Sequence, residues 1–409
     1  KVLFIDSEFL DSYIYMGDIF RTQKKFEKSI NCYDKALAIN PFSITALFRK
    51  GSIYKIEGEL DFAIKIYKEV LVLEPNNFNA YNNIGAIKIE QLCFTEALEI
   101  FNKVISLNPD FAFAHFNVGL IKGYIKDYKG AIERYRQALT LKPDFEISRA
   151  KLISMQSYIC DWEGIESSRD FIPELGIYEQ EVNPFSLFSF EDNPERHKKR
   201  SKNLVEKRYG QKPLAIDFKV KEKHKPIRIA YFSSDFKEHP VAYLLARVFE
   251  KHDRSQFKVY GYSIKGTKKD SMHKRLVCAF DDFKDLSDVS DKEAALIARE
   301  DGIDIAIDLN GYTQNSRTNI FAYRAAPIQI NYLGFPGTMG ADFMDYIIAD
   351  QTLIPEDSKK YYSEKLIYLP HTYMPTDNKR EISTKPMTRT EMGLPEDSFV
   401  FCCFNNNYK

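Results

Sequence analysis

Hydrophobic and polar positions in the first third of the chain repeat with a period of 34 residues. Four kinds of position share this period: a proline, a glycine, a small residue and an aromatic residue. They are Pro41, Pro75, Pro109 and Pro143; Gly17, Gly51, Gly85 and Gly119; Ser29, Ala63, Ala97 and Ala131; Tyr33, Tyr67, Phe101 and Tyr135. This period is typical of the tetratricopeptide repeat, a pair of antiparallel helices. It predicts four units over about 7–40, 41–74, 75–108 and 109–142, and a degenerate fifth after Pro143.

Each repeated residue type has a physical role in such a unit. The glycine and the small residue allow the two helices of a unit to approach closely. The aromatic residue, four positions after the small one, shares its helix face and is predicted to pack onto the next unit. The proline ends one unit and opens the following one. Because each unit buries its apolar face only by stacking, we expect a right-handed superhelix with a concave groove.

Two asparagines of this array are candidate peptide-binding residues. Asn83 and Asn117 each lie two positions before a repeat glycine, where the first two units carry Tyr15 and Arg49. A side-chain amide both donates and accepts, so a row of asparagines can pair with an extended peptide backbone of any sequence. The alternative, two solvated polar positions on a scaffold, remains open at this stage.

After about residue 160 the repeat ends and the pattern becomes helical with breaks. Residues 195–228 contain 13 basic and 4 acidic residues. A basic binding surface is one interpretation. Few aromatic residues accompany these charges, which favours a solvated helix and linker instead.

From residue 227 onward, apolar runs typical of buried strands alternate with amphipathic stretches typical of helices. The expected strands are 227–234, 257–264, 303–311, 328–335, 346–350, 365–370 and 398–406, and the expected helices are 241–252, 291–302 (closed by Gly302) and 388–397. Such alternation predicts a parallel, doubly wound sheet. Functional residues of such sheets follow the carboxyl ends of strands.

Candidate functional residues follow two of those strands. Asp235 and His239 follow the first strand, and the sequence NGYT, which contains Asn310 and Thr313, follows the third. The chain lacks GxGxxG, Walker and GxSxG sequences, which argues against a dinucleotide dehydrogenase, a P-loop ATPase and an α/β-hydrolase. No Asp-x-Asp sequence occurs in this region, so a metal-clamped nucleotide-sugar site of that kind is not indicated.

Composition narrows the class of protein further. The 409 residues are 44% hydrophobic and carry 58 basic and 58 acidic side chains. This balance argues against a dedicated nucleic-acid binder, and no apolar run is long enough for a membrane-spanning helix. The six cysteines form no CxxC pair, which predicts neither zinc binding nor a disulfide framework and favours a reducing, cytoplasmic location. The chain has neither an initiator Met nor a signal peptide, so we expect a fragment.

Several segments resemble the O-GlcNAc transferase/SPINDLY family of nucleotide-sugar protein glycosyltransferases. They are DWEGI, NPFSLFSF, SSDFKEHPVAYL, the whole stretch 301–351, YSEKLIYLPHTY and FNNNYK, preceded by the repeats as in that family. The sequences NGYT, LGFPGT and LPHTY are more similar to the O-GlcNAc transferase branch than to plant SPINDLY.

The resemblance implies inverting, metal-independent transfer from UDP-GlcNAc to Ser or Thr side chains of proteins, with no cofactor and no metal. It implies that His239 lies at the reaction centre as a base, that Asn310 and Thr313 line the sugar and acceptor side, and that Lys409 contacts the donor diphosphate. Two positions depart from the family pattern: Asn406 stands where relatives carry Gln at a donor contact, and Asp304 where some carry His.

Together these observations predict an α-solenoid of TPR repeats followed by a Rossmann-like α/β lobe, the first half of a GT-B glycosyltransferase. The expected domains are 1–160 (TPR superhelix), 161–225 (helical linker), 226–396 (N-terminal catalytic lobe) and 397–409 (start of a second lobe). The second lobe would hold the uridine pocket, so this fragment alone is expected to be inactive. Two alternatives remain: a SPINDLY-type O-fucosyltransferase that uses GDP-fucose, and a catalytically inactive TPR scaffold.

Overall fold

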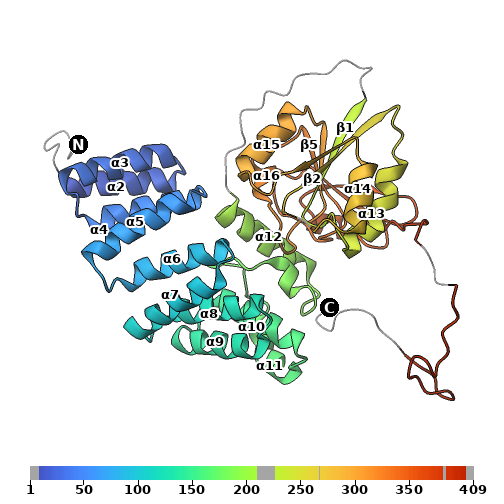
Figure 1. Ribbon diagram of the computed structural model, residues 1–409, viewed down its shortest axis with the longest axis horizontal. Coiled ribbons are helices and arrows are strands. Elements are labelled where there is room, and N and C mark those ends of the chain that lie inside the picture. The colour runs from blue at the N-terminus through green and yellow to red at the C-terminus, as the bar shows by residue number, and fades with distance from the viewer. Residues whose placement is uncertain (1–8, 210–225, 267, 381–383, 402–409) are drawn as a thin grey trace. The chain divides into compact units, whose positions relative to one another are not determined.

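The computed structural model describes residues 9–209, 226–266, 268–380 and 384–401. The chain divides into two compact units, Lys1–Arg169 and Asp170–Lys409, which are described separately below (Figure 1). The candidate donor-binding residues Asn406 and Lys409 lie outside the described residues, as does most of the strand expected over 398–406.

The first unit is a series of helix pairs with the predicted 34-residue period (Figure 1). The pairs are α2 (Leu10–Thr22) with α3 (Phe26–Ile39), α4 (Ile44–Ile56) with α5 (Leu60–Leu73), α6 (Phe78–Glu90) with α7 (Phe94–Leu107), α8 (Ala112–Tyr124) with α9 (Tyr128–Leu141), and α10 (Glu146–Tyr158) with the short α11 (Trp162–Glu166). The TPR solenoid is therefore confirmed, and α10 with α11 forms the fifth pair.

Aromatic rings explain the repeated glycines. A Cβ atom added to the glycine would lie within 3.0 Å of a ring carbon on the second helix of the same unit. The pairs are Gly17–Tyr33, Gly51–Tyr67, Gly85–Phe101 and Gly119–Tyr135. Each ring thus covers the glycine of its own unit. The predicted packing onto the following unit also holds for three of the rings, because Tyr67, Phe101 and Tyr135 join buried clusters with Ala80, with Ala114 and with Leu152 of the next unit, respectively.

The turn between the helices of each pair contains a second repeated feature, a residue with positive φ. These residues are Lys24, Gly58, Leu92, Lys126 and Cys160, with φ between 55° and 83°. Four of the five are not glycine, and a side chain in this conformation costs about 1–2 kcal/mol. Cys160 extends the spacing into the fifth unit, although Ile153 there replaces the expected glycine.

The second unit contains a seven-stranded, fully parallel sheet in the order β3-β2-β1-β4-β5-β6-β7. The strands are β1 (Ile227–Ser233), β2 (Phe257–Ser263), β3 (Asp282–Asp285), β4 (Ile305–Asp308), β5 (Ile328–Asn331), β6 (Tyr346–Ala349) and β7 (Lys365–Tyr368). In register, Ile229 of β1 pairs with Val259 of β2 and with Ile305 of β4. This confirms the Rossmann-like α/β lobe.

Helices cover both faces of this sheet. On one face, α13 (Pro240–Lys251) and α14 (Ser271–Ala279) pack on a core around Tyr231 and Phe249. On the other, α12 (Pro194–Arg208), α15 (Asp291–Glu300) and α16 (Asn319–Ala322) pack around Phe232 and Phe321. Short 3-10 helices complete the unit: η1 (Arg169–Phe171), which spans the division between the units, η2 (Pro184–Leu187) and η3 (Glu356–Tyr361).

Four features differ from the sequence expectation or bear directly on it. The edge strand β3 and helix α14 were not predicted. The helix expected over 388–397 is wrong, because residues 389–393 form turns and Gly393 adopts a φ of 65°. The helix end predicted at Gly302 is confirmed, since Gly302 follows α15 with a φ of 66°.

Candidate active site

The candidate site lies at the carboxyl ends of β1 and β4. These neighbouring strands are where the strand order reverses, because β2 and β3 extend the sheet to one side and β4 to β7 to the other. Ligands of doubly wound sheets bind in the crevice at such a switch point. The loop after β1 carries Asp235 and His239, and the loop after β4 carries Asn310 and Thr313, so the fold brings these four residues together.

Asn310 links the two loops. Its side chain is 1% exposed. Its Oδ1 accepts a hydrogen bond from Ser234 N at 2.9 Å, which fixes the orientation of the amide. Its Nδ2 lies 2.9 Å from Ser234 Oγ, 3.1 Å from Asp235 Oδ2 and 3.2 Å from Thr313 Oγ1. The amide of Asn310 therefore positions Asp235 and Thr313 through direct hydrogen bonds.

His239 is the N-cap residue of α13. Its Nδ1 accepts a hydrogen bond from Val241 N at 3.3 Å, while Pro240 at the first helical position has no N–H to satisfy. The same Nδ1 lies 3.9 Å from Asp235 Oδ2, and 37% of the His239 side chain is exposed. When Nδ1 accepts, the hydrogen of a neutral imidazole resides on Nε2, which then donates. Proton acceptance at Nε2 requires the other tautomer, in which Asp235 faces the Nδ1 hydrogen.

Asp308, the last residue of β4, is a buried acid that the sequence analysis did not identify. Its Oδ1 accepts from Asn310 N at 2.9 Å and from Gly311 N at 3.1 Å. Its Oδ2 has no hydrogen-bond partner among the described residues. Burial raises the pKa of Asp308 to about 6, although the two backbone N–H groups oppose this shift. The sequence did contain a sign of this residue, because Asp308 is an acid at the end of the otherwise apolar sequence IAID, residues 305–308.

Two side chains hold the NGYT loop in place. Tyr312 Oη donates to Met339 O at 2.6 Å, in the loop that follows β5. Arg317 Nε donates to Asp291 Oδ1 at 2.6 Å, and its Nη atoms donate to carbonyls of the β2–β3 region, Ile264 O, Leu286 O and Val289 O. The loop that carries Asn310 and Thr313 is thus tied to three other loops of the same unit.

The two candidate peptide-binding residues belong to the first unit. Asn83 lies on α6 and Asn117 on α8, the first helices of adjacent repeats, and both side chains are partly exposed. Asn117 Nδ2 donates to Asn82 Oδ1 at 3.1 Å, so one amide hydrogen bridges the two repeats. Peptide binding by Asn83 and Asn117 stays a prediction.

In the described part of the chain, no group of three or more His, Cys, Asp or Glu side chains is arranged to hold a metal ion. None of the helices of that part has the length and apolar character needed to cross a membrane. The four cysteines that lie in it, Cys32, Cys93, Cys160 and Cys278, are free thiols.

Comparison with known proteins connects this geometry to a family. Residues 195–385 match the model of glycosyl transferase family 41, and residues 17–55, 51–91 and 114–145 match models of the TPR repeat. A probable UDP-N-acetylglucosamine–peptide N-acetylglucosaminyltransferase SEC of Arabidopsis thaliana is 38% identical over 217 residues, 51% of this chain and 22% of that protein. A UDP-N-acetylglucosamine–peptide N-acetylglucosaminyltransferase of Caenorhabditis elegans is 39% identical over 177 residues, 42% of this chain and 15% of that protein.

Among solved structures, a mutant of the Thermobaculum terrenum O-GlcNAc transferase is 26% identical, with a TM-score of 0.47 over 81% of this chain and 58% of that one. The chain therefore contains a glycosyl transferase family 41 region after TPR repeats, and it is similar to proteins of the O-GlcNAc transferase/SPINDLY family. It aligns with 22% and 15% of the length of the two curated relatives.

Proposed function

We propose that the full-length protein containing this chain is an inverting, metal-independent protein glycosyltransferase. In this proposal it transfers N-acetylglucosamine from UDP-GlcNAc to Ser or Thr side chains of proteins that the TPR groove recruits. The observation that carries the proposal is the meeting of His239, Asp235, Asn310 and Thr313 at the ends of β1 and β4, inside the region that matches family 41. The two relatives from Arabidopsis thaliana and Caenorhabditis elegans are both named as UDP-N-acetylglucosamine–peptide N-acetylglucosaminyltransferases, which supports UDP-GlcNAc as the donor.

The proposed reaction is a single displacement at the anomeric carbon. The acceptor hydroxyl oxygen forms a new bond to that carbon, and the bond from the carbon to the diphosphate oxygen breaks. UDP leaves with the electron pair, and the hydroxyl proton goes to His239 Nε2. Histidine suits this role because its pKa lies near neutral pH. Lys409 is proposed to stabilise the leaving diphosphate by its positive charge.

In this mechanism Asp235 is a positioning residue for His239. The basic tautomer needs a hydrogen on Nδ1, and the carboxylate 3.9 Å away is the group that would hold it as the ring turns away from Val241 N. Asn310 keeps the carboxylate in place from the other side through its Nδ2. A charged acceptor also stabilises the imidazolium that forms when the proton is taken up.

The test is a transfer assay with two labelled donors. The full-length protein is incubated with a protein acceptor and either tritium-labelled UDP-GlcNAc or tritium-labelled GDP-fucose, with and without EDTA. The proposal expects label from UDP-GlcNAc only, a product linkage of inverted anomeric configuration, and no effect of EDTA. Label from GDP-fucose alone would favour the SPINDLY-type alternative. Acceptor binding without label from either donor would favour the scaffold.

A further inference from the structure

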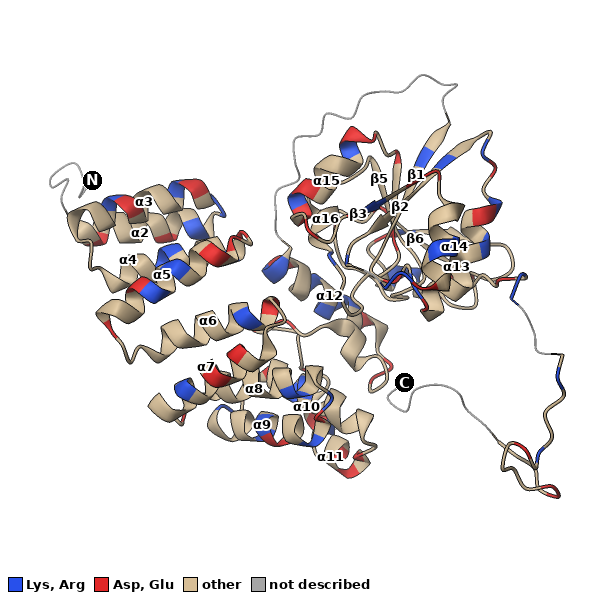
Figure 2. Ribbon diagram, in the orientation of Figure 1, with Lys and Arg blue, Asp and Glu red and all other residues tan. Residues whose placement is uncertain are grey.

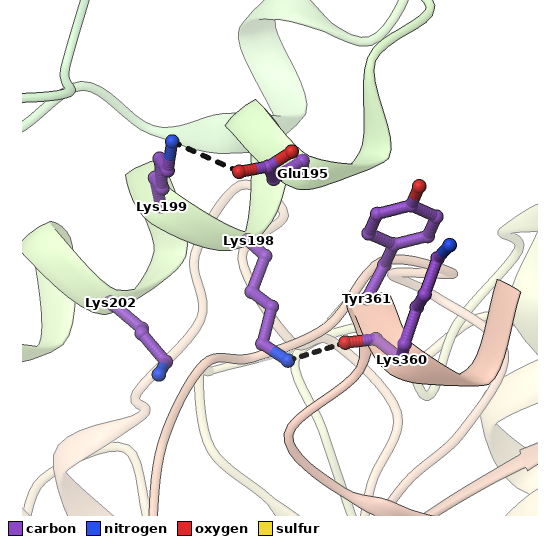
Figure 3. A pocket seen from close by; sticks show the side chains of 6 residues that line it. All are labelled: Glu195, Lys198, Lys199, Lys202, Lys360 and Tyr361. Atoms are coloured by element: carbon purple, nitrogen blue, oxygen red, sulfur yellow. Dashed lines mark hydrogen bonds and ion pairs between the residues drawn. The ribbon is translucent and has the colours of Figure 1, made fainter.

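A hollow of about 490 Å³ lies between α12 and η3, within the second compact unit (Figure 3). Its lining residues are Glu195, Lys198, Lys199, Lys202, Lys360 and Tyr361. Figure 2 shows the positive charges along α12, and Figure 3 shows Lys198 and Lys202 extending from the same helix beside Lys360 of η3. Two segments far apart in the sequence therefore contribute the four lysines that line the hollow, with Lys199 extending towards Glu195 and Lys360 alongside Tyr361.

The protein neutralises only one of these four charges at the hollow. The one acid of the lining, Glu195, pairs through Oε1 with Lys199 Nζ at 3.1 Å. Lys198 Nζ donates instead to two neutral carbonyls, Lys360 O at 2.7 Å and Tyr362 O at 3.3 Å. The ammonium groups of Lys202 and Lys360 have no carboxylate partner among the described residues.

Other charges nearby do not remove this imbalance. Burial lowers the pKa of Lys198, and the positive charge of Lys202 lowers it further, while Glu364 acts in the opposite direction. Glu364 is itself buried with a raised pKa, and its oxygens accept from Thr338 Oγ1 and Met339 N. Lys198 and Lys202 therefore repel each other in the free protein.

Several other positively charged side chains in the same unit differ from most of these lysines in having carboxylate partners among the described residues. Three arginines that pack between elements have carboxylate partners: Arg275 with Asp377 and Glu250, Arg317 with Asp291, and Arg324 with Asp345. Lys202 and Lys360 are exposed, so their ammonium groups are solvated in the free protein and remain available to an anion that enters the hollow. The arrangement is thus the opposite of the charge pairing that these arginines use.

We propose that this hollow is a binding site for a small soluble anion that carries at least two phosphate charges. Lysine ammonium groups are compact charges that suit phosphate oxygens, and Tyr361 adds an aromatic wall whose ring centre lies 5.1 Å from Lys360 Nζ. The volume falls in the range of small-molecule pockets. A hollow of this size favours a compact ligand over a flat membrane surface.

The position of the hollow separates it from the candidate active site. η3 ends four residues before β7 begins, so the hollow lies on the side of the sheet that carries the amino ends of the parallel strands. His239 and Asn310 follow β1 and β4, on the side that carries the carboxyl ends. The proposed anion is therefore a second ligand, different from the sugar donor, and the proposal does not depend on the proposed transferase activity.

Binding of inorganic pyrophosphate, measured by isothermal titration calorimetry on the whole chain, tests this proposal. Lys202→Gln combined with Lys360→Gln should weaken binding by about tenfold or more, because it removes both unpaired charges. Lys274→Gln combined with Lys292→Gln removes two exposed charges from α14 and α15 and should leave the affinity nearly unchanged. Lys202→Arg combined with Lys360→Arg keeps the charges and should keep binding.

Thermal unfolding supplies an independent readout of the same variants. Pyrophosphate should raise the melting temperature of the wild type and of the arginine variant. It should not raise that of the glutamine variant, which without ligand should be at least as stable as the wild type because repulsion is relieved. The proposal is overturned if the wild type does not bind pyrophosphate, if the control pair weakens binding equally, if UDP displaces pyrophosphate, or if only phosphatidylserine-containing vesicles bind.

Discussion

Asn310 Nδ2 lies 3.1 Å from Asp235 Oδ2, across the ends of two neighbouring parallel strands. The same carboxylate oxygen faces His239 Nδ1 at 3.9 Å. One buried amide thus connects the loop after β4 to the residue that the family resemblance places at the reaction centre. In the proposed mechanism, this carboxylate stabilises the tautomer of His239 that carries its hydrogen on Nδ1.

Replacing this carboxylate should therefore impair transfer more than binding. Asp235→Asn keeps the size of the side chain but removes the charge that favours a hydrogen on His239 Nδ1. We expect the rate of single-turnover transfer by the full-length protein to fall about tenfold to a hundredfold, because part of the general-base contribution is lost. The affinity for UDP should not change. Asp342→Asn, an exposed acid of the same unit, is the matched control. Equal rates for the two variants would show that Asp235 does not position the base.

Asp308 should make the stability of the second unit depend on pH. Its folded pKa of about 6 lies above the ordinary value of 3.8, so the folded state retains a proton that the unfolded chain has already lost. Its contribution to the free energy of unfolding is therefore favourable below pH 4 and is lost as the pH rises to about 6. A difference of about two pKa units corresponds to about 3 kcal/mol.

Calorimetric unfolding of the wild type and of Asp308→Asn at several pH values measures this effect. The asparagine keeps an acceptor for Asn310 N and Gly311 N but does not titrate. Between pH 4 and 7 the wild type should lose up to about 3 kcal/mol relative to the variant. Parallel curves for the two proteins would contradict the assignment of this pKa.

The turn residues with positive φ offer a test of strain in the solenoid. Lys126 is exposed and has a φ of 64°, so Lys126→Gly should stabilise the first unit by about 0.5–1 kcal/mol, the relief of strain less the added flexibility of glycine. Lys103, exposed in the middle of α7, is the control, and Lys103→Gly should destabilise by about 1 kcal/mol. Thermal unfolding by circular dichroism compares them. Destabilisation by both substitutions would show that the positive φ of Lys126 does not strain the turn.

The sequence predicted the solenoid well because each repeat uses the same contacts. Gly85 and Phe101 recur in one spacing since a ring must fit over a bare backbone, and that requirement is visible in the sequence alone. The central strands were equally clear, since β1 and β4 are buried on both faces and read as continuous apolar runs. The site residues at their ends followed from topology and from the family resemblance.

What the sequence did not predict depends on tertiary contacts. β3 contains Asp282 and Lys284, shows no apolar alternation, and is a strand only because β2 offers a free edge. The segment 388–397 has helical composition but contains Gly393 and Pro395, and residues 389–393 form turns. The role of Asp308 depends on its burial, which the local sequence does not specify.

The asparagines of the solenoid can be tested by acceptor size. Asn83→Ala combined with Asn117→Ala should weaken the binding of long protein acceptors, each lost amide costing about 0.5–1.5 kcal/mol. Short peptide acceptors and donor hydrolysis should change little. Asn102→Ala combined with Gln137→Ala, exposed polar residues on the second helices α7 and α9, is the control. Equal losses for short and long acceptors would argue against a peptide-binding role.

The most direct test of the proposed reaction centre is single-turnover sugar transfer by His239→Asn in the full-length protein. Asparagine is a favoured N-cap residue, so it can still accept from Val241 N and preserve the start of α13, but it cannot take up the hydroxyl proton. General-base help is worth about 10²–10⁴-fold in rate. The variant should therefore transfer N-acetylglucosamine from UDP-GlcNAc slower by about that factor while binding UDP as the wild type does. Transfer within about threefold of the wild-type rate, below the general-base range, would contradict the assignment of His239 as the base.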